Sequence, residues 1–94
     1  MFVKLLKSKL HRARVTDTKV HYPGSIAIDP EIMEAAGIVP YEFVLVADVD
    51  NGNRLQTYAV PGESGMGEIV MLGAAAKLIE KGDLVIIFSF GYYD

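Results

Sequence analysis

The sequence predicts a small, mainly β closed barrel with short helices. Several short segments alternate apolar and polar residues, Gly-rich turns separate them, and only two short segments have helical character. The chain has 94 residues, of which 51% are hydrophobic, so it is long enough for one globular domain and leaves little room for a second. We therefore predict a single domain over residues 1–94.

The first half of the chain predicts strands followed by one helix. Residues 2–8 alternate roughly, residues 12–16 continue an extended pattern, and residues 25–29 alternate strictly. Residues 29–38 then predict a short helix, because Asp29 is suited to the N-cap, a proline follows it, and a glycine ends the segment.

The second half predicts a hairpin and two further strands. Residues 41–49 and 54–60 are expected as strands joined by DNGN, the strongest hairpin signal in the chain. Residues 67–72 predict another strand and residues 73–79 one or two helical turns. The continuous apolar run at 84–90 predicts a fully buried strand.

Charge is distributed unevenly along the chain. The net charge is −3, yet residues 1–20 carry six lysines and arginines against Asp17 alone. A basic segment in an acidic protein favours a small anionic ligand over nucleic acid, whose partners usually have a basic domain overall. A solvated strand face would have the same composition.

The composition also limits the means of stabilisation and the location. There is no cysteine and no cluster of residues at metal-ligand spacing, so we expect neither a disulfide nor a metal. Burial in a homo-oligomer is the remaining source of stability for so short a chain. No apolar run approaches a membrane span, and the N-terminus does not fit a signal peptide, so a cytoplasmic protein without membrane contact is expected.

The dipeptide Gly24–Ser25 permits an unusual reaction. A serine hydroxyl can attack the carbonyl carbon of the preceding residue and convert the amide into an ester. Gly24 could adopt a strained backbone that exposes its carbonyl, and Pro23 would fix its approach. Elimination from the ester and hydrolysis would leave a pyruvoyl group at the new N-terminus. In isolation, the dipeptide is also an ordinary turn entering a strand.

The surrounding motifs add a resemblance. The segments KSKLHRARVT, HYPGSIAID, DPEIMEAAGI, NGNRLQTY and GAAAKLIEKGDLVII together resemble the aspartate 1-decarboxylase family, over about residues 4–90. The resemblance implies a double-psi β-barrel, assembly as a tetramer with sites at subunit interfaces, and self-cleavage into chains 1–24 and 25–94. It also implies a pyruvoyl group made from Ser25, which acts as the electron sink in decarboxylation of L-aspartate to β-alanine for pantothenate biosynthesis.

The same resemblance implies roles for individual residues. Tyr58 corresponds to the proton donor, and Arg54 and Lys9 correspond to the cations that hold substrate carboxylates. Thr57 corresponds to the hydroxyl that polarises the Gly24 carbonyl and also contacts substrate. The remaining pocket positions are a wall of small residues and two neighbours that orient groups there, namely Gly73, Ala74, Ala75, His11 and Tyr22.

Two departures from the family pattern leave alternatives open. Leu72 stands where the family typically has asparagine, and family members usually continue past the position of Asp94. A processing-impaired or non-catalytic barrel paralogue is therefore an alternative. A related pyruvoyl decarboxylase acting on glutamate is another, because Lys9 and Arg54 favour any dicarboxylate substrate. A small DNA-binding barrel is a further one, disfavoured by the acidic total and the absence of a recognition helix.

Overall fold

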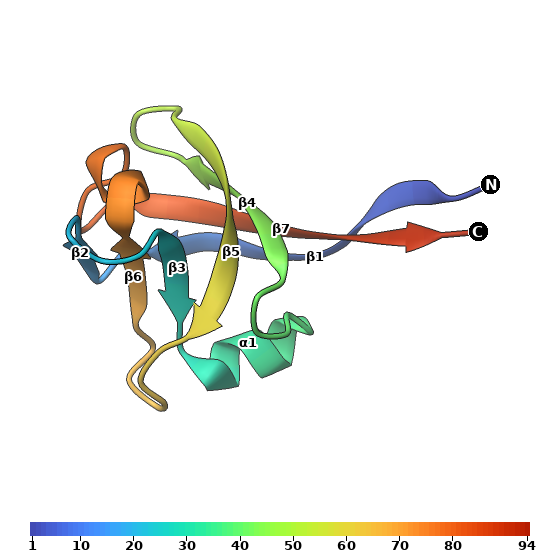
Figure 1. Ribbon diagram of the computed structural model, residues 1–94, viewed down its shortest axis with the longest axis horizontal. Helices are drawn as coiled ribbons and strands as arrows, with labels where there is room; N and C mark the ends of the chain where they lie inside the picture. Colours follow the sequence, from blue (N-terminus) through green and yellow to red (C-terminus); the bar gives the residue numbers. More distant parts are fainter.

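The computed structural model describes all residues, 1–94, and is mainly β, as predicted (Figure 1). Seven strands form one sheet in the order β1-β7-β4-β5-β3-β6-β2, with parallel pairing only between β2 and β6 and between β3 and β5. The elements are β1 (Val3–Arg14), β2 (Asp17–Lys19), β3 (Ser25–Ile28), α1 (Pro30–Ala36), β4 (Phe43–Asp48), β5 (Arg54–Pro61), β6 (Ile69–Leu72), the 3₁₀ helix η1 (Gly73–Lys77) and β7 (Leu84–Tyr93). Closure into a double-psi barrel stays a prediction.

The local signals for the first helix and the hairpin are confirmed, since α1 follows Asp29 and β4 pairs antiparallel with β5. The Asp29 side chain accepts a hydrogen bond from the backbone N–H of Glu31 (2.9 Å), and Gly37 ends the helix with a φ of 69°. The Asp29 carboxylate also accepts from Gly65 N (2.9 Å) and Gly67 N (2.8 Å), which ties α1 to the loop before β6. These backbone donors, that of Glu31 first, lower the pKa of Asp29.

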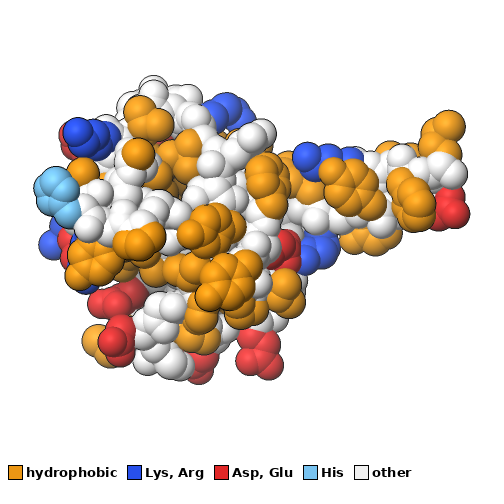
Figure 2. All heavy atoms as spheres, viewed as in Figure 1, with side chains coloured by type: hydrophobic (Ala, Val, Ile, Leu, Met, Phe, Trp, Pro, Cys, Tyr) orange, Lys and Arg blue, Asp and Glu red, His pale blue; other side chains and the backbone are white.

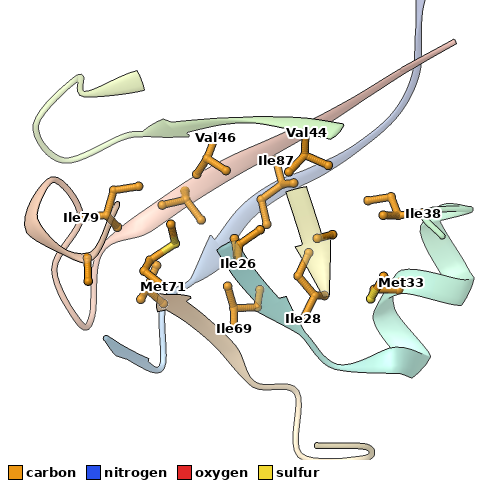
Figure 3. Packing of buried hydrophobic residues seen from close by; sticks show 14 residues of the cluster. Ile26, Ile28, Met33, Ile38, Val44, Val46, Ile69, Met71, Ile79 and Ile87 are labelled. Atoms are coloured by element: carbon orange, nitrogen blue, oxygen red, sulfur yellow. The ribbon is translucent and has the colours of Figure 1, made fainter. Parts of the chain in front are cut away.

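The hydrophobic core lies between the strands, with α1 at one end (Figure 3). Figure 3 shows Ile26, Val46 and Ile87 converging from β3, β4 and β7. Met33 of α1 contributes at one end and Ile79, after η1, at the other. Alternate residues of each strand face this core, because successive side chains in a strand point to opposite faces.

The prediction that residues 84–90 form a fully buried strand is wrong. In β7 buried residues alternate with half-buried ones, and the strand continues to Tyr93. The reason is its position in the sheet: β7 pairs with β1 and β4 antiparallel, and only one of its faces contacts the core. The other face carries Phe88 and Phe90, whose rings stack at 6.4 Å.

The ends of β1 and β7 form a two-stranded ribbon that projects from the body of the molecule (Figure 1). Hydrophobic side chains run along this ribbon and continue onto the adjoining body (Figure 2). The exposed apolar residues of the ribbon are Met1, Phe2, Val3, Leu5, Leu6, Tyr92 and Tyr93. None of the helices is long and apolar enough to cross a membrane.

Candidate active site at the Gly24–Ser25 peptide

Ser25 begins β3, in the middle of the sheet. Its neighbours are β5 on one side and β6 on the other, and its register partner is Leu72. Only 3% of Ser25 is exposed, so its hydroxyl lies inside the fold rather than on a free turn. The preceding residues 20–24 are a turn, as the sequence predicts.

A cavity of about 310 Å³ opens beside this peptide. Both residues of the predicted cleavage site line it, together with Thr57 from β5 and the small residues Ala74 and Ala75 from η1. The complete lining is Gly24, Ser25, Leu55, Gln56, Thr57, Ala74, Ala75 and Leu78. The fold thus brings together residues from three separate segments of the sequence, and the volume lies at the lower end of the range for small-molecule sites.

Gly73 is required by a close approach of two backbones. A Cβ added to Gly73 would lie 2.6 Å from the Cα of Gly24 and 2.8 Å from the carbonyl oxygen of Tyr22. Its φ of 74° is also in the left-handed region that favours glycine. The start of η1 therefore packs directly on the Gly24 segment.

Gly24 does not have a left-handed backbone conformation. It is absent from the residues with positive φ, and a Cβ added to it would meet only the Leu72 carbonyl oxygen, at 3.9 Å. The turn of residues 20–24 leads into regular β3 pairing without a left-handed residue at Gly24. The folded structure therefore has space for a side chain at position 24, and any requirement for glycine there comes from the cleavage reaction.

Tyr58 and Arg54 do not line the cavity. Along β5, Leu55, Thr57 and Ala59 are buried or half-buried, whereas the alternate residues are exposed, although one of them, Gln56, borders the cavity. Tyr58 is 38% exposed, and its ring lies 6.1 Å from that of Tyr41. Arg54 is exposed and forms no ion pair within the chain.

The three remaining predicted pocket residues also lie outside this cavity within one chain. Lys9, on β1, lines a separate cavity of about 750 Å³ between β1 and α1. His11 and Tyr22 are exposed, and Lys19 Nζ lies 5.2 Å from the centre of the Tyr22 ring. The structure therefore brings together the predicted processing residues but not the predicted substrate cations.

A partly buried ionic network joins β1, β7 and the segment before β4. Lys7 Nζ donates to Glu42 (2.9 Å) and to the Gly37 carbonyl oxygen (2.8 Å), and the Ser89 hydroxyl donates to the same carboxylate. Burial alone would raise the pKa of Glu42, but the hydrogen bonds from Ser89 and Lys7 hold that pKa below its ordinary value. No local pattern in the sequence indicates this network.

Three carboxylates form a second cluster that the sequence did not reveal. One carboxylate oxygen each of Asp48, Asp50 and Asp83 lies within 4.8 Å of those of the other two. Asp48 and Asp50 are near neighbours, but Asp83 comes from a distant turn. The expectation of no metal-ligand cluster rested on spacing along the sequence, which does not show that Asp83 lies beside Asp48 and Asp50.

Comparison with known proteins assigns the chain to a family. The model of a family described as aspartate decarboxylase matches residues 1–94. The chain belongs to the aspartate decarboxylase family. It is 59% identical over 90 residues to aspartate 1-decarboxylase of Thermosipho africanus, covering 96% of this chain and 75% of that protein. The enzyme of the same name from Acetivibrio thermocellus is 53% identical over 94 residues, which is 100% of this chain and 75% of the relative.

The aspartate decarboxylase family resemblance stated from the sequence is thereby confirmed. Because the match covers the whole chain, it includes the Gly24–Ser25 peptide and every element that lines the cavity beside it. The residues present fit a pyruvoyl group at Ser25. That side chain lies on the wall of a cavity, and Gly73 leaves room for the peptide that would have to open.

Proposed function

We propose that this chain is a proenzyme that cleaves itself between Gly24 and Ser25 and then decarboxylates L-aspartate to β-alanine, a reaction of pantothenate biosynthesis. The observation that carries the proposal is the position of the Gly24–Ser25 peptide on the wall of a cavity shared with Thr57 and Ala74, in a chain matched by the aspartate decarboxylase family from end to end. The products are chain 1–24 and chain 25–94.

Self-cleavage uses only groups of this chain and water. The Ser25 Oγ attacks the Gly24 carbonyl carbon and its proton passes to the departing Ser25 nitrogen, while Thr57 stabilises the oxygen that becomes negative. The C–N bond breaks and an ester forms. Loss of the Ser25 α-proton then expels the Gly24 carboxylate, and water hydrolyses the remaining enamine with release of ammonia. This sequence leaves a ketone on residue 25.

The pyruvoyl group supplies a ketone that binds the substrate amine and accepts the electron pair left by the departing carboxylate. The side chains perform the remaining tasks. Arg54 and Lys9 bind the two carboxylates of aspartate, and the Tyr58 hydroxyl donates a proton to the substrate carbon that loses CO₂. Ala74 and Ala75 leave space for the substrate against η1.

Arg54, Tyr58 and Lys9 lie outside the Ser25 cavity of their own chain, which supports a site completed by a second copy. Exposed apolar side chains support such assembly, because monomers rarely expose patches of this extent. They cover the ribbon of β1 and β7 (Figure 2), and Tyr41 and Phe43 are exposed as well. We therefore propose a homo-oligomer, specifically a tetramer, that works in the cytoplasm without nucleic acid or membrane partners.

A substrate assay tests this function. Protein incubated until cleavage is complete is given L-aspartate or L-glutamate, and CO₂ and the product amine are measured. We expect β-alanine from aspartate and at least tenfold less turnover with glutamate, because an added methylene displaces one carboxylate from its cation, a change typically worth about 1–3 kcal/mol. Equal or greater turnover of glutamate would contradict the substrate assignment. Cleaved protein without turnover of either would contradict the activity.

A further inference from the structure

The aspartate cluster lies where the β4–β5 hairpin meets the turn before β7. Asp48 ends β4, Asp50 is in the hairpin loop, and Asp83 immediately precedes β7. Their carboxylate oxygens lie within 4.8 Å of one another. Oxygens bound to one Ca²⁺ at about 2.3–2.6 Å are at most about 5 Å apart, so this spacing is compatible with a shared ion.

Asp48 is the unusual member of the cluster. It is 2% exposed, and its Oδ2 atom is buried without a hydrogen-bond donor. The Asp83 carboxylate, a like charge, belongs to the same cluster. The two ion pairs of the structure, Met1–Asp94 and Lys7–Glu42, lie elsewhere. A buried acceptor among like charges is costly unless a cation or a proton is shared there.

Backbone N–H groups hold all three carboxylates in place. Asp48 Oδ1 accepts from Asp50 N (2.8 Å), Asp50 Oδ2 from Leu84 N (2.9 Å), and Asp83 Oδ2 from Glu80 N (3.0 Å). Each carboxylate is therefore oriented through one oxygen, and none has both oxygens occupied by donors. Metal-ligating carboxylates are commonly fixed by hydrogen bonds in the same way.

We propose that Asp48, Asp50 and Asp83 bind one divalent cation through carboxylate oxygens, with Ca²⁺ the preferred ion. Three hard oxygen ligands exclude a preference for soft metals. Asp50 lies in an exposed loop beside open solvent, which leaves room for the water ligands that complete a Ca²⁺ shell. The site would act as a cross-link, because its ligands come from the β4–β5 hairpin and from the turn before β7.

The cross-link would stabilise one wall of the Ser25 cavity. Asn51 Nδ2 (3.1 Å) and Asn53 Nδ2 (2.9 Å) of the same hairpin donate to the carbonyl oxygen of Leu78, which lines that cavity. The ion would hold the hairpin in the position from which these bonds are made. The proposal concerns binding and stability and does not depend on catalysis at Ser25.

Calorimetric titration of chelator-treated protein with CaCl₂, MgCl₂ and MnCl₂ tests the site. We expect saturable binding of one Ca²⁺ per chain, with Kd below about 1 mM, and weaker binding of Mg²⁺, which demands stricter geometry. At ten times Kd, Ca²⁺ should raise Tm by at least about 4 °C. Asp48→Asn keeps an oxygen for the backbone N–H groups of Asp50 and Asn51 and removes a ligand charge. It should weaken binding at least tenfold and reduce the Tm shift at the same Ca²⁺ concentration to about a third or less.

Matched variants distinguish the site from general charge effects. Glu63→Gln removes an exposed acid elsewhere and should bind Ca²⁺ as the wild type does. Should Asp48→Asn not fold, Asp50→Asn, at an exposed ligand, should still weaken binding. Absence of saturable binding up to about 10 mM of any of the three cations, or equal binding by wild type and folded variant, would overturn the proposal. The pair of Asp48 and Asp83 would then share a proton instead.

Discussion

Ser25 of β3 lies directly opposite Leu72 of β6 in the antiparallel ladder. Residues that face each other across such a pair project to the same side of the sheet, so the apolar Leu72 side chain is the cross-strand neighbour of the Ser25 hydroxyl. Leu72, which stands where the family typically has asparagine, therefore lies beside the Gly24–Ser25 peptide bond that is proposed to break.

Replacing this neighbour should change the rate of cleavage. Leu72→Asn places a hydrogen-bonding amide beside Ser25, and one such bond in the transition state should accelerate cleavage about 2- to 10-fold. The rate is measured from the decay of the intact chain on denaturing gels. A rate that is unchanged or lower would show that Leu72 does not limit processing.

Gly73→Ala should disrupt the site by steric overlap. The new Cβ would lie 2.6 Å from the Cα of Gly24. We expect the free energy of unfolding to fall by at least about 2 kcal/mol more than after the same substitution at a glycine with similar φ and free space, and we expect cleavage to be lost. Gly37→Ala is the matched control, since Gly37 has φ of 69° and nothing within 4 Å of its Cβ position. It should cost about 1–2 kcal/mol and leave cleavage intact. Equal decreases in the free energy of unfolding of the two variants, measured by urea unfolding, would argue against the close approach of Gly73 and Gly24.

Thr57→Val removes a hydroxyl from the cavity wall without changing the shape of the side chain. If Thr57 stabilises the developing oxyanion, cleavage should slow roughly 100- to 1,000-fold. Stability should hardly change, because valine has high β-propensity. Thr18→Val, in β2, is the control and should be cleaved at the wild-type rate. A Thr57→Val protein that is cleaved normally would exclude the role of the hydroxyl.

Stability should fall in acid because several carboxylates, Glu42 and Asp29 among them, have lowered pKa values in the folded state. For Glu42 and Asp29 the stabilisation is fully present above the unfolded pKa, about 4, and is lost as pH falls through the lower folded pKa. Tm measured from pH 7 to pH 2 should therefore decline below about pH 4. Glu42→Gln should flatten this decline, whereas Glu63→Gln should not. Parallel curves for all three proteins would contradict the assignment to Glu42.

The parts of the fold that were predictable depend on local signals. Asp29 and Gly37 mark the ends of α1 by their chemistry alone, and DNGN fixes the hairpin between β4 and β5. The partial burial of β7 could not be predicted, because it depends on which faces its neighbours cover. The contact of Asp83 with Asp48 likewise depends on tertiary structure.

The candidate site was likewise predictable only in part. Gly24, Ser25 and Thr57 were expected near one another from the family resemblance, and the fold of one chain places them on one cavity. The proximity of Lys9 and Arg54 to that cavity stays a prediction, since it requires a second copy. Gly24 is not in the left-handed region, and regular β3 pairing begins at the next residue.

Intact-mass measurement of the purified, incubated protein tests self-cleavage most directly. We expect two fragments, 1–24 and 25–94, with the larger one lighter than its unmodified sequence by one ammonia, the change from serine to pyruvoyl. Ser25→Ala should remain intact, while Ser64→Ala, at an exposed loop position, should be cleaved like the wild type. A wild-type chain that stays a single species of full-length mass after prolonged warming would contradict the proposed function.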